Sequence, residues 1–155
     1  MATQRQGTDF GILLGLAYQA FVVELRDDLE RAGLDGLGRA DGYVFRALDE
    51  QPLTVSELAT RLGVTKQAAG QIVDDLEARG YVRREPHPEG GRRRLVVLTD
   101  KAQAHLVAAG QVLHGLEAEL SQRLGRPELA AMRHTLARLV RELAGPTLPP
   151  LRPLW

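Results

Sequence analysis

The sequence predicts a mainly α-helical protein that carries one small β-hairpin. Apolar residues recur at helical spacing over residues 8–32 and 100–124, and two shorter helical patterns fill residues 54–80. The hairpin is indicated by β-prone runs at residues 81–82 and 95–98, which flank a connection rich in proline and glycine. These observations fix the order of elements as long helix, short helices, hairpin, long helices.

The two short helices have clear start and stop signals. Thr54 and Glu57 stand at the spacing of a capping box, in which each residue satisfies a free N–H group of the other. Gly63 can end this helix in the left-handed conformation, and Thr65 is a natural N-cap for the next helix, which stops near Gly80. The sequence therefore predicts two helices joined by a tight turn, a helix-turn-helix.

The second helix of this pair has an apolar inner side and a small, amide-rich outer side. At about 100° per residue, the inner side holds Ala69, Ile72, Val73 and Leu76. The N-cap and the opposite side hold Thr65, Lys66, Gln67, Gly70 and Gln71. Glutamine can pair with adenine, lysine can reach guanine or phosphate, and the first turns of such a helix meet base edges. These five residues are therefore predicted to bind DNA, although Gly70 also fits the reading of a tolerated surface glycine.

The hairpin is strongly basic. Residues 83–94 contain five arginines and two glutamates, a local balance of +3. Arg92, Arg93 and Arg94 follow the turn directly, where they could probe a minor groove or phosphates. A solvated charged turn is the alternative, but motif, order and charge agree on DNA. We therefore predict a winged helix-turn-helix over residues 38–99.

Three segments of this region resemble the MarR family of bacterial transcription regulators. They are Val64-Thr-Lys-Gln-Ala, Leu76-Glu-Ala-Arg-Gly-Tyr-Val and Arg92-Arg-Arg-Leu-Val-Val-Leu-Thr. The resemblance implies a homodimer that binds a pseudo-palindromic double-stranded DNA operator, often as a repressor released by a small molecule. Arg92 matches the wing arginine of the family. Gly90 and His87-Pro88 stand where the family usually has an acidic residue and Asp-Pro, so the usual bracing of that arginine is missing from the pattern.

The helices outside this region are predicted to form a dimer. The first helix is apolar beyond a single stripe. The helix predicted over residues 100–124 has a coiled-coil-like seam of Leu106, Ala109, Leu113, Leu116 and Leu120. We assign residues 1–37 and 100–155 to dimerisation. The segment 146–155 is rich in proline and contains three leucines and the single tryptophan, and we expect it to pack on the dimerisation helices of the partner.

Composition excludes several classes of function. Twenty basic residues balance twenty acidic ones, but residues 1–60 carry −5, residues 61–101 carry +3 and residues 102–155 carry +2. There is no cysteine, which excludes disulfides, thiolate zinc sites and thiol-based sensing. The apolar run 10–23 is shorter than the ~20 residues of a membrane-spanning helix. We expect a cytoplasmic protein without a membrane partner.

Catalysis finds no support in the sequence. The four histidines match neither a metalloprotease motif nor a nucleophile triad, so no enzyme activity, metal or cofactor is predicted. Two binding functions remain open. A small aromatic or drug-like effector could bind beside Tyr18, Tyr43 and Phe45, or the dimer could act constitutively or under a protein partner. Use of the fold only as a protein-interaction dimer is a third alternative.

Overall fold

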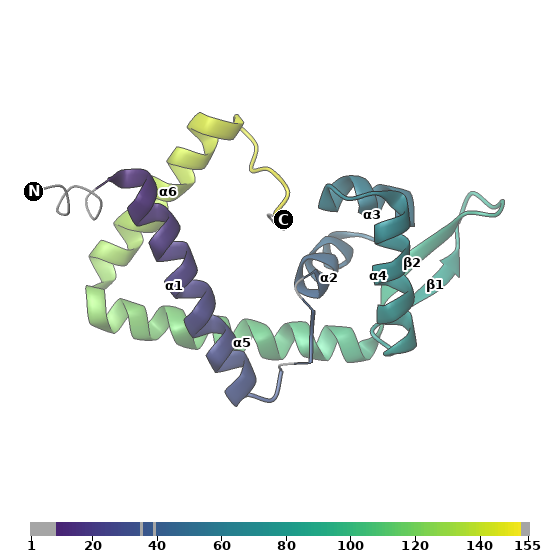
Figure 1. Cartoon of the computed structure of the whole chain (residues 1–155), viewed down its shortest axis with the longest axis horizontal. Coiled ribbons are helices and arrows are strands. Elements are labelled where there is room, and N and C mark those ends of the chain that lie inside the picture. The colour runs from purple at the N-terminus through teal and green to yellow at the C-terminus, as the bar shows by residue number, and fades with distance from the viewer. Residues whose placement is uncertain (1–8, 35, 39, 153–155) are drawn as a thin grey trace, which may run out of the picture.

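The structure, a computed structural model, describes residues 9–34, 36–38 and 40–152. Its elements are α1 (Phe10–Arg31), α2 (Asp41–Glu50), α3 (Val55–Leu62), α4 (Lys66–Ala78), β1 (Val82–Pro86), β2 (Arg94–Leu98), α5 (Asp100–Leu124) and α6 (Arg126–Ala144). The predicted mainly helical fold with one antiparallel hairpin is confirmed. Figure 1 shows α2 to β2 gathered at one end of the chain, with α1 and α6 at the other and α5 running between them. The predicted start of the first helix, residue 8, lies outside the described residues.

The caps of α3 and α4 are those that the sequence predicts. The Thr54 hydroxyl accepts a bond from the Glu57 backbone N–H, and the Glu57 carboxylate accepts one from the Thr54 N–H at 2.7 Å. Gly63 ends α3 with φ +70°, a conformation that costs any residue with a β-carbon energy. Thr65 then caps α4 by accepting a bond from the N–H of Ala68. The capping box thus fixes the start of α3, and Gly63 and Thr65 fix the turn between the two helices.

The hairpin, called here the wing (residues 82–98), pairs β1 with β2 in antiparallel register. Val82 lies opposite Leu98, and Pro86 lies opposite Arg94. An isolated bridge between Leu53 and Val96 ties β2 to the segment that precedes α3. The wing is therefore joined to the helix-turn-helix on the side of α3, and it follows α4 directly in the chain.

One hydrophobic core lies among α2, α3, α4, the wing and the start of α5. We call residues 41–98 around it the winged lobe. The largest fully buried side chains are Phe45, Leu58, Leu62, Leu76, Val44, Val73, Val82 and Val96. The predicted inner face of α4 is confirmed, because Ala69, Val73 and Leu76 are buried and Ile72 is partly buried. Packing of this face turns the opposite face of α4 to solvent.

The long helices lack such a core within one chain. Among the described residues, α1 and α6 contain no buried side chain and α5 contains two. Both α1 and α6 pack against α5, yet they leave many large apolar side chains exposed. These are Phe10, Ile12, Leu13, Leu14, Leu16, Tyr18 and Val23 of α1, and Met132, Leu136, Val140 and Leu143 of α6. None of the described helices is apolar and long enough to cross a membrane.

Candidate nucleic-acid interface

The outer face of α4 is accessible. Lys66, Gln67 and Gln71 are exposed, as is the capping residue Thr65. A β-carbon built on Gly70 meets nothing within 4 Å, so packing within this chain does not require glycine at that position. The structure therefore gives no internal reason for the roughly 1 kcal/mol that a mid-helix glycine costs relative to alanine.

The second half of α4 is acidic, and an arginine of the wing neutralises part of that charge. Arg84 of β1 donates to Asp74 at 2.6 Å and also pairs with Glu77. Burial lowers the pKa of Arg84, but its hydrogen bonds to Asp74 and Glu77 outweigh burial and raise it. The sequence counted Arg84 in the basic cluster, whereas the structure uses it to join the wing to α4.

The arginines after the wing turn differ in their partners. Arg93 pairs with Glu89 at 2.7 Å, and His87 accepts a bond from the Glu89 N–H. Arg92 and Arg94 are exposed and have no ion pair within the described part of the chain. The carboxylate that the sequence lacks at position 90 is thus supplied one position earlier, and it braces Arg93.

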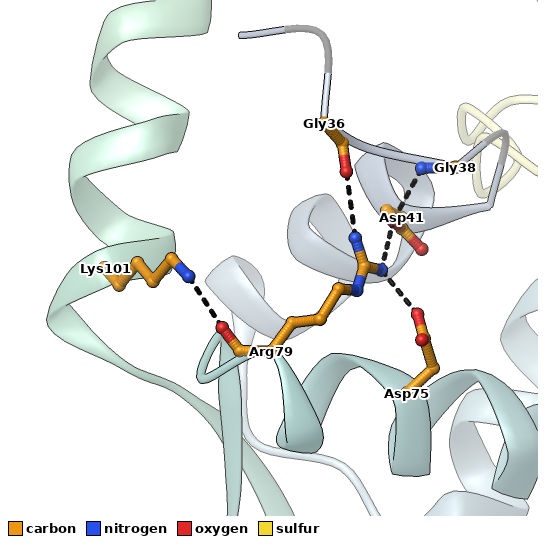
Figure 2. A network of polar contacts seen from close by, with 6 residues as sticks. All are labelled: Gly36, Gly38, Asp41, Asp75, Arg79 and Lys101. Carbon is orange, nitrogen blue, oxygen red and sulfur yellow. Dashed lines mark hydrogen bonds and ion pairs between the residues drawn. The ribbon is translucent and has the colours of Figure 1, made fainter.

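A polar network anchors the far end of α4 (Figure 2). Arg79, the C-cap of α4, donates to Asp41 at 2.7 Å, to Asp75 at 2.6 Å and to the carbonyl of Gly36 at 3.0 Å. The Asp41 carboxylate, only 6% exposed, also accepts from the N–H of Gly38 at 2.7 Å. The hydrogen bond to Asp41 raises the pKa of Arg79, although burial lowers it. The sequence analysis did not identify this network, because Arg79 and Asp41 lie 38 positions apart.

The network continues into α5. Lys101 donates to the Arg79 carbonyl at 2.6 Å, and its Nζ lies 4.3 Å from the ring centroid of Tyr81. The Tyr81 ring in turn packs on Phe45 and His105, with centroid distances of 5.3 and 6.0 Å. The end of α4 is therefore fixed to the α1–α2 connection on one side and to α5 on the other.

His105 makes the stability of this junction sensitive to pH. Burial lowers the pKa of His105 below its ordinary value of about 6.5, and the charge of Asp41 opposes the shift. Above that value the histidine is neutral in both states and the junction has its full stability. As the pH falls through 6.5 the unfolded chain takes up the proton more readily, so we expect the free energy of unfolding to decrease from pH 7.5 to 5.5. Chemical denaturation at both pH values should show a smaller decrease in His105→Gln than in the wild-type protein.

The three residues predicted to bind an effector occupy two places. Tyr18 of α1 lies close to Tyr43 of α2, and burial together with the interaction with Tyr18 raises the pKa of Tyr43. Tyr18 is 56% exposed, whereas Phe45 is fully buried between Tyr81 and His105. The structure thus brings the two tyrosines together and places Phe45 in the core. Among the described residues, no group of three or more acidic, histidine or cysteine side chains could hold a metal ion.

The capped helix pair, the exposed amide-rich face and the arginine-bearing hairpin define a winged helix-turn-helix protein of the DNA-binding class. Residues 35–93 match the sequence profile of the MarR family. This match and the solved structures described next confirm the predicted resemblance to this family of winged-helix transcription regulators and the predicted fold, and the proteins that the chain resembles are regulators rather than enzymes.

Two solved structures of regulators are similar to this chain, and one sequence relative covers most of it. The transcriptional repressor CouR, solved with a 23-mer DNA duplex, superposes with a TM-score of 0.73 and 26% identity over 91% of this chain and 99% of that chain. Apo MarR of Escherichia coli gives a TM-score of 0.68 and 25% identity over 85% of this chain and 97% of that chain. An uncharacterized protein of Mycobacterium tuberculosis is 28% identical over 126 residues, 78% of this chain and 88% of that protein.

Proposed function

We propose that this protein is a homodimeric transcriptional repressor that binds a pseudo-palindromic double-stranded DNA operator in the cytoplasm. The exposed face of α4 is the observation that carries the proposal. It presents a lysine and two glutamines beside a glycine with open space around it. Similarity to CouR, which was solved on DNA and is described as a repressor, supports the same conclusion.

In this proposal α4 contacts the DNA bases, and the wing binds the DNA backbone. Thr65, Lys66, Gln67, Gly70 and Gln71 face the major groove, where the open space at Gly70 permits close approach. Arg92 and Arg94 bind phosphates or the adjacent minor groove, since no carboxylate in the described chain competes for them. Arg93 contributes charge while Glu89 holds the wing turn in shape.

The exposed apolar faces of α1 and α6 support the homodimer. Leu13 of α1 is 48% exposed and Leu143 of α6 is 79% exposed, whereas the large apolar side chains of the winged lobe form a buried core. Many large apolar side chains exposed on the same two helices mark an interaction site. A second copy would bury both helices and set a fixed span between the two α4 helices, about one DNA turn of ~10 base pairs.

We also propose that a small aromatic or drug-like effector binds beside the Tyr18–Tyr43 pair and releases the DNA. The pair joins α1 to α2, so a ligand there contacts both the dimerisation helices and the winged lobe. Such a ligand must bind the DNA-free arrangement more tightly than the DNA-bound one. A thermal-shift screen of aromatic acids and drug-like cations, followed by DNA binding with each hit, tests this. A protein stabilised by no compound in the screen would favour constitutive binding or control by a protein partner.

Gln67→Ala is expected to relax base specificity. Loss of a bidentate contact to one base should cost about 1–3 kcal/mol on the preferred operator and little on sequences that differ at that base. Fluorescence anisotropy with a set of duplexes from the upstream intergenic DNA, each changed at one position, measures the effect. The control is Gln122→Ala at the exposed end of α5, distant from the lobe (Figure 1). Equal losses on every duplex would contradict a base contact by Gln67.

Arg92→Ala is expected to act on all DNA sequences alike. Removal of one phosphate contact should weaken every duplex and reduce the slope of log affinity against log salt by about 1. Affinity measured from low to high salt gives the slope. Arg138→Ala, which removes an equal charge from an exposed position on α6, should leave it unchanged. An unaltered slope in Arg92→Ala would show that the wing arginine does not touch DNA.

A further inference from the structure

A shallow apolar hollow lies at the turn of the helix-turn-helix. It has a volume of about 540 Å³ and is lined by Gly63, Val64, Thr65, Ala68 and Ile72. Most of its lining consists of aliphatic carbon, although the hollow opens to solvent. A short apolar segment could cover this surface next to the first turn of α4.

The chain segment that follows α6 reaches the edge of this hollow. Figure 1 shows it leaving the end of α6 and crossing toward α3. Arg152 lies against Gly63, because a β-carbon built on that glycine would be 3.3 Å from Nη1 and 3.5 Å from Cδ of the arginine. Gly63 also lines the hollow, so the last described residue of the segment stands at its border.

The next three residues are long enough to reach into the hollow and have apolar side chains. Pro153, Leu154 and Trp155 can extend about 10 Å beyond Arg152 at ~3.3–3.6 Å per residue. Leucine and tryptophan offer large apolar side chains to an apolar surface. Pro149, Pro150 and Pro153 restrict the segment, which lowers the entropy lost on docking.

We propose that residues 153–155 dock in the hollow at the α3–α4 turn of their own chain. The docked segment covers Thr65, the N-cap of α4, and Ala68, and these two residues flank Lys66 and Gln67 in the chain. It therefore competes with DNA for that turn. This second consequence rests on the proposed DNA-binding function, whereas the docking itself does not.

The only tryptophan of the chain is a direct probe of docking. In the full-length protein without DNA, Trp155 should show blue-shifted emission and protection from acrylamide. Ala68→Gln places a polar side chain in the hollow and should shift the emission to that of a solvated indole. Ala78→Gln, on an exposed position of the same helix, should leave it blue-shifted. Circular dichroism of both variants confirms that the helices remain folded.

Two results of this experiment would overturn the proposal. One is a solvated Trp155 in the wild-type protein. The other is a buried Trp155 whose emission is the same in Ala68→Gln and changes only when the dimer dissociates. That result would place the segment on the helices of the partner.

DNA affinity supplies a separate measurement. If the segment occupies the hollow nine-tenths of the time, a chain truncated after Arg152 should bind DNA about tenfold more tightly than the full chain. Unchanged affinity in the truncated chain would overturn the competition while the emission data still decide the docking. Failure of both chains to bind any DNA would refute the DNA-binding function instead, again without affecting the emission result.

Discussion

Asp41→Ala is expected to lower the free energy of unfolding by about 2–3 kcal/mol. The Asp41 carboxylate is 6% exposed and accepts bonds from Arg79 Nη2 and the Gly38 N–H, both at 2.7 Å. Removal of one partner of a buried ion pair costs ~3–5 kcal/mol when the remaining charge stays buried. Arg79 is 30% exposed, so water can partly replace the lost carboxylate and the expected cost lies below that range.

Asp75→Ala is the matched control for this substitution. Asp75 pairs with the same Arg79 nitrogen at 2.6 Å, but its side chain is 63% exposed. An exposed ion pair of this kind contributes ~0–1 kcal/mol. Urea denaturation followed by circular dichroism compares the two variants directly. Equal losses of unfolding free energy in both variants would mean that burial of Asp41 does not determine how strongly the Arg79 network holds the end of α4.

The Arg79 network links the stability of the winged lobe to the position of α4, the helix proposed to contact DNA. It joins the C-terminal end of α4 to the connection before α2, and Lys101 joins the same end to α5. The N-terminal end of α4 carries the residues proposed to read bases. A ligand or partner that shifts α1 relative to α5 would thus act on α4 through Arg79. In Asp41→Ala this coupling should weaken together with the stability of the lobe.

The local parts of the fold were predictable from the sequence. Thr54, Gly63 and Thr65 set the limits of α3 and α4 through bonds within a few residues, so the pattern of residue types contains the information. The inner face of α4 follows from its apolar spacing in the same way, and the outer face follows by exclusion. The family resemblance then gave the order of the elements a functional interpretation.

The contacts between distant segments were not predictable in this way. The pair Arg79–Asp41 and the cluster of Phe45, Tyr81 and His105 each join residues far apart in the chain. Phe45 illustrates the limit, since an aromatic residue on an apolar face fits either a core or a pocket until its neighbours are known. The ion pair between Arg93 and Glu89 joins residues four positions apart and was open to prediction, but the family pattern has its acidic residue at position 90 instead.

Leu136→Asp is expected to dissociate the proposed dimer. Met132, Leu136, Val140 and Leu143 follow one side of α6 at helical spacing, and all four are exposed in the single chain. In a symmetric dimer each substitution occurs twice. Loss of leucine burial and desolvation of an unpaired carboxylate should cost at least ~2 kcal/mol per copy, which gives about 4 kcal/mol and a ~1000-fold weaker dimer. Sedimentation velocity across a range of protein concentrations measures this change.

Ala131→Asp introduces the same charge on the side of α6 that faces away from both this stripe and the α5 contact, where Ala131 is exposed. It should leave self-association within about twofold of the wild-type value, because a solvated carboxylate costs almost nothing. Operator binding adds a second criterion, since a lone winged lobe touches one half-site and loses the contribution of the other. If Leu136→Asp remained dimeric at nanomolar concentration, the apolar stripe of α6 would need another partner. If it became monomeric yet bound the operator as tightly as before, the fixed span between two α4 helices would have no part in recognition.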